Sequence, residues 1–212
     1  MSQLDTKTRL LDAAENLFSI HGFSNTSMRA ITTQASANLA AANYHFGSKE
    51  ALLSAVLDRR LLPLNQQRSE RIDQVLAAAE STSRQPASAD LLRAFIEPTM
   101  AFRCDESGSS DFVSIIGRSL TATDPVVRDQ FIERVRPLLN KLHQSLCLAL
   151  PQIPAELIFI RLFFAMGAMG HCICFSGISS IFKSQMSCDT EDKEILTDNL
   201  LAFVTAGLEA PC

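Results

Sequence analysis

The sequence predicts an all-α protein, in which a three-helix domain containing a helix-turn-helix unit (residues 1–50) precedes a six-helix domain (residues 51–212). Apolar residues recur three and four positions apart along most of the chain, and no stretch alternates as a half-buried strand would. With 212 residues and 47% apolar content, the chain is long enough to bury a sizeable core.

The first helix is expected over residues 7–20, because Leu11, Ala14 and Phe18 recur at helical spacing. The pair His21-Gly22 is a stop signal for this helix. Phe23 directly after the stop is then placed to pack under the helices that follow.

A helix-turn-helix unit is expected next. Ser27 is a good N-cap for a short helix that carries Ile31 and Ala35 on one face, and the three small residues after Ala35 allow a tight turn. The second helix, about residues 39–45, is too short to be stable alone. Because it is rich in alanine and ends in Asn, Tyr and His, it can lie close to the floor of a DNA major groove.

A candidate phosphate site follows this second helix. Gly47 is free to take positive φ and closes the helix, and Ser48 caps the next one. The first turn of that next helix presents Lys49 beside its N-terminus. Backbone N–H groups and an ammonium therefore converge where a phosphate could bind.

Over residues 11–53 the chain resembles the TetR family of bacterial transcriptional regulators. Four segments fit the family pattern in order and at the right distances: Ala13-Ala14-Glu15-Asn16-Leu17-Phe18, His21-Gly22-Phe23, Thr26-Ser27-Met28-Arg29 and Tyr44-His45-Phe46-Gly47-Ser48-Lys49-Glu50-Ala51-Leu52. The resemblance implies double-stranded DNA with a palindromic operator as one partner and a small-molecule effector as another. It also implies a homodimer whose interface is a four-helix bundle made by the last two long helices of each subunit.

The predicted DNA contacts fall into two groups. We expect Asn43, Tyr44 and His45, with Leu39 and Ala42, to face the groove. The phosphates are expected to be contacted by Ser27, Arg29 and Lys49. The full candidate set is Ser27, Arg29, Asn38, Leu39, Ala41, Ala42, Asn43, Tyr44, His45 and Lys49. The chain has a formal charge of −4, but its first sixty residues carry six Lys and Arg against five acids, which places the phosphate-facing part there. So small an excess implies modest non-specific affinity.

The remaining helices are predicted from their start and stop signals. A long helix begins at Ser48, with Pro63 interrupting or kinking it, and residues 81–90 form the clearest loop. Asp124-Pro125 is a strong start signal for a helix to about Leu150, in which Pro137 predicts a kink. The other helices are expected over 91–103, 112–120, 155–182 and from 189 to the C-terminal region.

Residues 162–182 form a run of 21 residues without formal charge, long enough to span a bilayer at about 1.5 Å per residue. Scattered Gly, Ser and His dilute it, and no basic cluster or aromatic belt orients it, so we expect no membrane partner. A helix apolar nearly all round is instead buried on several sides, against its own domain and a second subunit. The candidate interface residues are Ala165, Gly167, Ala168, Gly170, Leu196, Leu200 and Phe203.

A ligand site is expected on the remaining apolar side of these helices, although the same residues fit plain core. The candidates are Phe95, Phe102, Phe112, Ile115, Ile116, Arg118, Phe163, Met166, His171 and Phe175. Arg118 and His171 are candidate anion anchors, with structural roles as the alternative. Ten phenylalanines and no tryptophan beyond residue 60 suit an acyl chain better than a sugar or nucleotide.

The sequence shows no pattern typical of disulfides, a metal site or an enzyme. Six cysteines without regular spacing, and no signal-peptide pattern, predict reduced thiols in a cytoplasmic protein. Cys172 and Cys174 point about 200° apart on a helix and make a poor metal pair, so no metal or cofactor is expected. The four histidines are scattered and no nucleophile-base-acid set appears, which argues against an enzyme.

The sequence as a whole predicts a homodimeric transcriptional regulator, most simply a repressor whose C-terminal domain senses an apolar or amphipathic molecule. Residues 38–46 look like those of family members that respond to fatty acids or acyl-CoA, which argues for a related operator more than for a related ligand. A ligand-independent regulator is the main alternative, and an enzyme is the alternative from another class.

Overall fold

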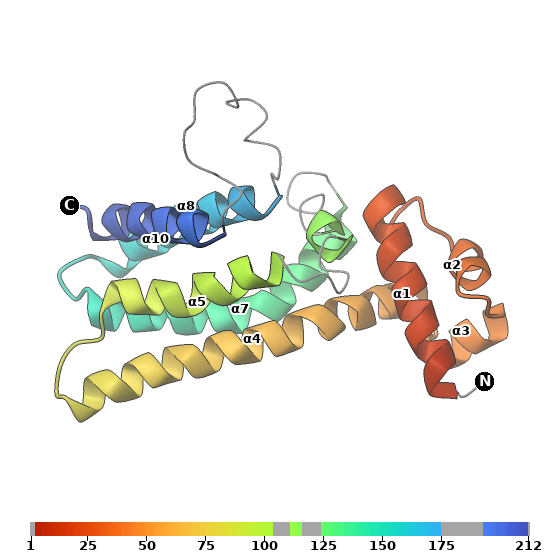
Figure 1. Cartoon of the computed structure of the whole chain (residues 1–212), viewed down its shortest axis with the longest axis horizontal. Helices are drawn as coiled ribbons and strands as arrows, with labels where there is room; N and C mark the ends of the chain where they lie inside the picture. The colour runs from red at the N-terminus through yellow and green to blue at the C-terminus, as the bar shows by residue number, and fades with distance from the viewer. Residues whose placement is uncertain (1–2, 104–110, 116–123, 175–192, 212) are drawn as a thin grey trace, which may run out of the picture. The chain divides into compact units, whose positions relative to one another are not determined.

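The computed structural model describes residues 3–103, 111–115, 124–174 and 193–211, and the regular structure within these ranges is all helical. The helices are α1 (Gln3–His21), α2 (Met28–Gln34), α3 (Leu39–Phe46), α4 (Lys49–Ser81), α5 (Ser88–Arg103), α7 (Pro125–Ala149), α8 (Ala155–Cys174) and α10 (Lys193–Glu209) (Figure 1). Residues 111–115 form a further short helical segment. The predicted all-α class is confirmed.

Capping residues set the predicted helix boundaries. The Ser27 hydroxyl accepts a hydrogen bond from the N–H of Ala30 at 3.1 Å, as an N-cap does. Gly22 and Gly47 have φ of +78° and +76° and follow the last residues of α1 and α3. At the start of α7, the N–H of Val126 donates to the Asp124 carboxylate at 3.2 Å. These starts and stops are therefore as the sequence predicts.

Pro63 does not interrupt α4, which is continuous from Lys49 to Ser81. The extension of α8 to residue 182, the start of the last helix at residue 189 and the segment 116–120 lie outside the described residues.

The chain divides into two compact units, each made of two separate stretches of sequence. Unit 1 comprises residues 1–63 and 106–135, and unit 2 comprises residues 64–105 and 136–212. The helices α4 and α7 each contribute to both units, because they are continuous across residues 63 and 135.

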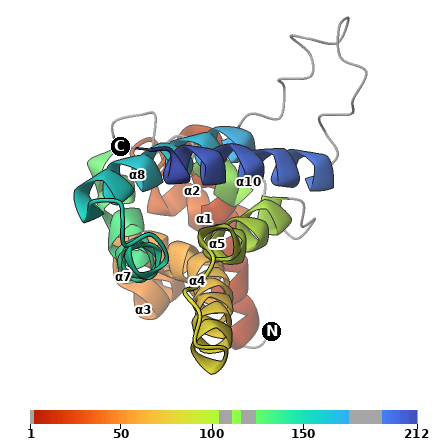
Figure 2. The same ribbon diagram turned by 90° about the vertical axis from the view of Figure 1, so that its left-hand side faces the viewer.

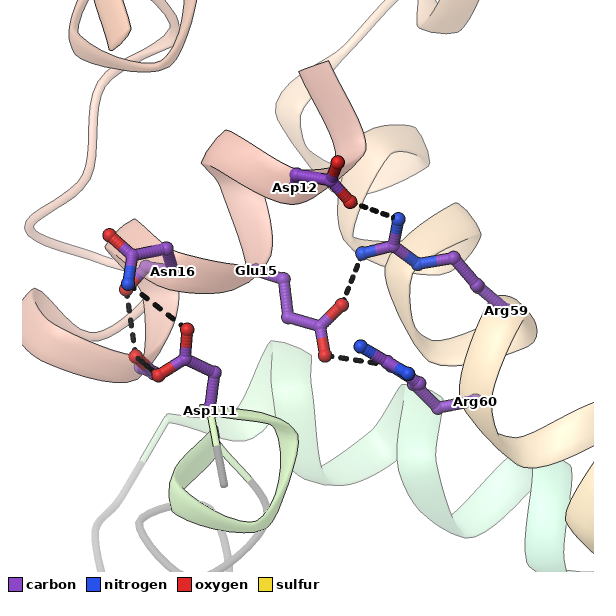
Figure 3. Close-up of polar contacts among 7 residues, drawn as sticks. Asp12, Glu15, Asn16, Arg59, Arg60 and Asp111 are labelled. Atoms are coloured by element: carbon purple, nitrogen blue, oxygen red, sulfur yellow. Dashed lines mark hydrogen bonds and ion pairs between the residues drawn. The ribbon is translucent and has the colours of Figure 1, made fainter. Parts of the chain in front are cut away.

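Unit 1 is built on α1, which packs against α2 and α3. Its centre contains Leu10, Phe18 and Ile31, each at most 1% exposed, and the Phe18 and Phe23 rings lie 5.4 Å apart between centroids. Polar contacts join α1 to later segments (Figure 3). Asp111 accepts hydrogen bonds from Asn16 at 3.0 Å and Ser19 at 2.9 Å, so the 111–115 segment is bonded directly to α1.

Unit 2 has one apolar core, to which α4, α5, α7, α8 and α10 contribute. Helix α10 packs against both α5 and α8 (Figure 2). Lys141 of α7 donates to the Ser69 hydroxyl and the Asp73 carboxylate of α4, both at 2.7 Å. The core therefore collects residues from helices that lie far apart in the sequence, such as Ile72, Leu142 and Leu208.

Helix α8 carries more apolar surface than its own chain covers. Residues 155–173 form the only stretch of the described chain long and apolar enough to cross a membrane by length and composition, yet only 22% of its apolar part is buried. One such helix is weak support for a membrane span, since a helix at an interface between soluble subunits has the same composition.

Candidate DNA-binding site

The turn between α2 and α3 is fixed by an arginine from α1. Arg9 donates through Nη1 to the carbonyl oxygens of Ala35 at 2.6 Å and Ser36 at 3.2 Å. Ser36 takes φ of +49°, and the N–H of Ala37 donates to the Thr32 carbonyl at 2.9 Å. The tight turn predicted from three small residues is therefore confirmed. The carbonyl groups at the end of α2 that have no partner within the helix accept hydrogen bonds from Arg9 and from the turn.

Asn38 starts α3 as its N-cap, because its Oδ1 accepts a hydrogen bond from the N–H of Ala41 at 2.7 Å. The cap uses the oxygen of the side-chain amide and leaves the NH₂ group available as a donor. Asn38 is exposed and Ala41 half-buried. Both stay candidates for DNA contact, with Asn38 also needed to hold the helix.

The outer face of α3 is formed by Leu39, Ala40, Asn43 and Tyr44, which are all exposed. Tyr44 is the most open of them at 75%, and its ring meets the His45 ring edge-on, 5.3 Å between centroids. This spacing of residues 39, 40, 43 and 44 is the one expected for a single helix face. Ala40 was missing from the predicted set although it lies one turn before Tyr44.

Ala42 is a correction to the predicted groove face. Its side chain is 0% exposed, so it cannot reach a base from this position. It lies on the inward side of α3, opposite Asn43 and Tyr44, where a larger side chain would push α3 away from the rest of the unit. Its role is therefore packing, and the small size that suggested close approach to DNA serves the core instead.

Lys49 has internal partners that the sequence did not predict. Its ammonium donates to the carbonyl oxygens of Phe23 at 2.9 Å and Thr26 at 3.0 Å, and it lies 4.2 Å from the centroid of the Phe23 ring. It thus holds the loop between α1 and α2 against the start of α4. A phosphate contact from Lys49 remains a proposal and would use the N–H that these two bonds leave over.

The helix start at Ser27 is open to solvent. Ser27 and Arg29 are exposed, and the Ser27 hydroxyl keeps its O–H as a donor while its oxygen caps α2. Of the six cations in the first sixty residues, only Lys7 and Arg29 are exposed, whereas Arg9, Lys49, Arg59 and Arg60 are partly buried. The positive charge that is exposed for phosphate contacts is therefore small. Because Lys7 is one of the two exposed cations, it is a further candidate for phosphate contact.

The predicted ligand-site residues that the structure describes fall in both units. Phe112 and Ile115 are buried in unit 1, whereas Phe95 is buried in the core of unit 2. Phe163 is a correction, since it is 69% exposed on α8 and lines no interior. Met166 packs against the unit 2 core, and His171 is exposed. Ile116, Arg118, Phe175 and the Phe102 side chain lie outside the described part of the chain.

The predicted interface residues divide into buried and exposed ones within the single chain. Ala165 and Leu200 are 4% and 6% exposed within the single chain, so they belong to the core of unit 2, a correction to their expected place. Ala168 and Leu196 pack against that core and Gly170 is half-buried. Gly167 and Phe203 are exposed, with Phe203 at 71%. Helical spacing alone did not distinguish the inward stripe from the outward one.

No group of three or more His, Cys, Asp or Glu that could hold a metal ion occurs in the part of the chain that the structure describes. Cys147 Sγ and His143 Nε2 lie 3.7 Å apart on α7, as two neighbouring residues of one helix face.

Comparisons with known proteins agree with this architecture. Residues 10–56 match the family model "Bacterial regulatory proteins, tetR family", and residues 93–207 match "Tetracyclin repressor-like, C-terminal domain". The transcriptional regulator UidR of Escherichia coli K12 is 42% identical over 52 residues, which are 24% of this chain and 26% of UidR. The match therefore spans only about a quarter of that relative.

Solved structures share the fold along nearly the whole chain. FadR from Bacillus subtilis in complex with stearoyl-CoA has a TM-score of 0.67 at 14% identity, covering 94% of this chain and 98% of FadR. FadR from Bacillus halodurans has a TM-score of 0.68 at 12% identity, covering 96% of each chain. Since the two family models together cover the helix-turn-helix and most of the C-terminal domain, the chain belongs to the TetR family and is a DNA-binding transcriptional regulator.

Proposed function

We propose that this TetR-family regulator is a homodimeric repressor that acts in the cytoplasm and leaves its operator when an amphipathic acyl compound binds its C-terminal domain. Residues 1–50 would read DNA, and residues 51–212 would bind the effector and the second subunit. The mechanism is a shift between two conformations, of which only one holds the two copies of α3 at successive major grooves. An effector changes this balance only if it binds the two conformations with different affinity.

The DNA-reading role of α3 is supported by its open outer face. Asn43 offers an amide that can bond two atoms of one base, and Tyr44 offers an exposed hydroxyl and ring. Ser27 and Arg29 at the start of α2 supply donors for phosphates. With so few exposed cations, specificity rests on these base contacts and on a second copy of α3 bound to the other half-site.

Dimerisation is supported by a face of α8 and α10 that its own chain leaves uncovered. Phe159, Phe163 and Phe164 are 61%, 69% and 66% exposed along α8, and Phe203 is 71% exposed on α10. An added Cβ at Gly167, on the same side of α8, would meet no atom within 4 Å, so this place is open for close approach. Exposed aromatic groups on this scale favour a protein–protein interface, which we assign to a second subunit.

The main support for an acyl effector is the structural similarity of nearly the whole chain to a FadR that was solved in complex with stearoyl-CoA. An apolar core that joins five helices of unit 2, including Phe95, Ile96 and Met100 of α5, suits an acyl chain. A sugar or nucleotide would need several converging polar groups instead.

The decisive experiment is an operator-release assay. The operator is first found by selection from random double-stranded DNA, and release is then measured by mobility shift with fatty acids, acyl-CoAs, sugars and nucleotides. We expect release by acyl compounds only. Release by sugars or nucleotides alone would disprove the effector class, and release by none of them would favour a ligand-independent regulator.

A further inference from the structure

Arg68 of α4 is a cation buried inside unit 2. The residue is only 4% exposed. Charged side chains are almost never buried this completely unless they are paired, because removing a charge from water costs several kcal/mol. A group that compensates the charge of this guanidinium is therefore expected, either within the fold or in a bound ligand.

The partners of Arg68 within the described residues are all neutral. Its Nε donates to the Thr99 hydroxyl oxygen at 3.1 Å, Nη2 donates to the same oxygen, and Nη1 donates to Asn65 Oδ1 at 3.0 Å. Thr99 donates its own hydroxyl to the Phe95 carbonyl at 2.9 Å, which turns its lone pairs toward Arg68. The Phe95 ring lies 4.4 Å from the guanidinium carbon. Thr99 and Asn65 orient the guanidinium without neutralising it.

Two acidic groups of α4 and α5 are engaged with other cations. Glu97 of α5 pairs with Arg71 at 3.0 Å and with Arg93 at 2.8 Å, and Asp73 of α4 pairs with Lys141 at 2.7 Å. No carboxylate of the described residues pairs with Arg68. Burial accordingly lowers the pKa of the Arg68 guanidinium to about 9, because desolvation acts there without a compensating negative charge.

The hydrogen-bonding pattern leaves a specific part of the guanidinium unused. A guanidinium has five N–H groups, one on Nε and two on each terminal nitrogen. The bonds to Thr99 and Asn65 use one N–H on each of Nε, Nη1 and Nη2. One N–H on Nη1 and one on Nη2 are left, which is the number and kind of donors that a carboxylate accepts as a bidentate pair.

We propose that Arg68 is the anion site of the effector, and that it binds the carboxylate of a long-chain amphipathic acid whose apolar tail lies among the core helices of unit 2. This inference rests on the proposed function and narrows its effector to a free acid. A carboxylate is small enough for a site this deep, with Phe95 against the guanidinium, whereas a nucleotide-bearing head group would need more polar partners. Arg68 thus takes the role that the sequence analysis gave to Arg118 or His171.

The test uses the full-length protein and three probes that share one acyl chain: oleate, methyl oleate and oleoyl-CoA. Binding is measured by calorimetry below the micellar concentrations, and thermal unfolding is measured without ligand. The variants are Arg68→Met, which keeps an unbranched apolar stem, and Arg71→Met on the same helix as the matched control, because Arg71 is already paired with Glu97.

We expect wild type and Arg71→Met to bind oleate about 10- to 100-fold more tightly than methyl oleate, the range for a hydrogen-bonded charged group. Arg68→Met should bind oleate and methyl oleate equally. Its melting temperature without ligand should equal or exceed that of wild type, because the substitution removes a buried charge that the folded chain does not neutralise.

Four results would overturn the inference. If Arg68→Met keeps the preference for oleate, Arg68 does not bind the carboxylate. If this variant melts several degrees below wild type, the folded chain itself compensates the Arg68 guanidinium, and no ligand is needed to do so. Tighter binding of oleoyl-CoA that also depends on Arg68 would assign the site to phosphate. If wild type binds none of the three probes, the proposed effector class itself fails, a result distinct from the other three.

Discussion

The Glu15 carboxylate of α1 lies 2.9 Å from Nε of Arg60 on α4, and its other oxygen accepts a hydrogen bond from Arg59 (Figure 3). Glu15 is 3% exposed, and Asp12 adds a second acceptor to Arg59 at 2.6 Å. Burial opposes the charge of Arg59, but the hydrogen bonds and charges of Asp12 and Glu15 outweigh it and raise the pKa of the guanidinium. One buried carboxylate thus joins α1 to the start of α4 within unit 1.

Replacing Glu15 with Gln should destabilise unit 1 by about 2 kcal/mol, less than the roughly 3–5 kcal/mol of a fully buried pair, because both arginines keep some contact with water. The change leaves two guanidinium groups facing a neutral amide. The midpoint of urea unfolding at fixed protein concentration would measure it. Asp12→Asn is the control, with an expected loss of about 0–1 kcal/mol because Asp12 is exposed. Equal losses in the two variants would contradict the central role of Glu15.

Ala42→Leu should disrupt the helix-turn-helix unit, whereas Ala40→Leu should not. Ala42 is 0% exposed, and overpacking a close-packed site costs about 1–3 kcal/mol. Ala40 lies on the exposed face of the same helix. Circular dichroism and thermal unfolding should show a loss for Ala42→Leu alone, while mobility shifts should show weaker operator binding for both. A stable Ala42→Leu variant with unchanged DNA binding would show that α3 can move outward without cost.

The local signals of the fold were readable from the sequence, because each acts within four residues. Ser27, Gly47 and Asp124 are a cap, a positive-φ stop and a helix start, and each needs only its neighbours to be recognised. The helix-turn-helix, its turn and the all-α class follow from such signals together with helical spacing.

The sequence could not show which of two neighbouring apolar stripes faces inward. Ala42 and Asn43 are adjacent in α3, and Ala165 and Phe163 are two residues apart in α8, yet one of each pair is buried and the other exposed. The choice depends on helices far away in the chain. Arg68 was missed for the same reason, since its partner Thr99 is 31 residues away and nothing local marks the arginine as buried.

Phe163→Glu and Phe203→Glu should each separate the proposed dimer. A carboxylate placed on an apolar interface loses its hydration without gaining a partner, and aromatic anchors in interfaces are worth at least about 2 kcal/mol each. Sedimentation velocity should therefore show a dimer dissociation constant raised by about 30-fold or more, with operator affinity falling in parallel. Leu62→Glu is the control, because Leu62 is 58% exposed on α4 and outside the proposed interface. A monomer that still binds a palindromic operator tightly would disprove the coupling.

Loss of a base contact and loss of a phosphate contact should change DNA affinity in different ways. Asn43→Ala should lower affinity for the operator by about 10- to 100-fold while leaving random DNA unaffected, because a bidentate amide–base pair is worth about 1–3 kcal/mol of discrimination. Arg29→Ala should weaken binding to both DNAs and make the salt dependence shallower by about one unit of slope for each subunit.

Lys49→Ala is a less specific test of phosphate contact, because the ammonium also bonds the carbonyl groups of Phe23 and Thr26 and its loss should lower thermal stability as well. Binding measured against salt concentration on operator and random DNA gives both the discrimination and the slope for each variant. If Asn43→Ala and Arg29→Ala lowered operator and random affinity by the same factor, the division between the outer face of α3 and the start of α2 would be wrong.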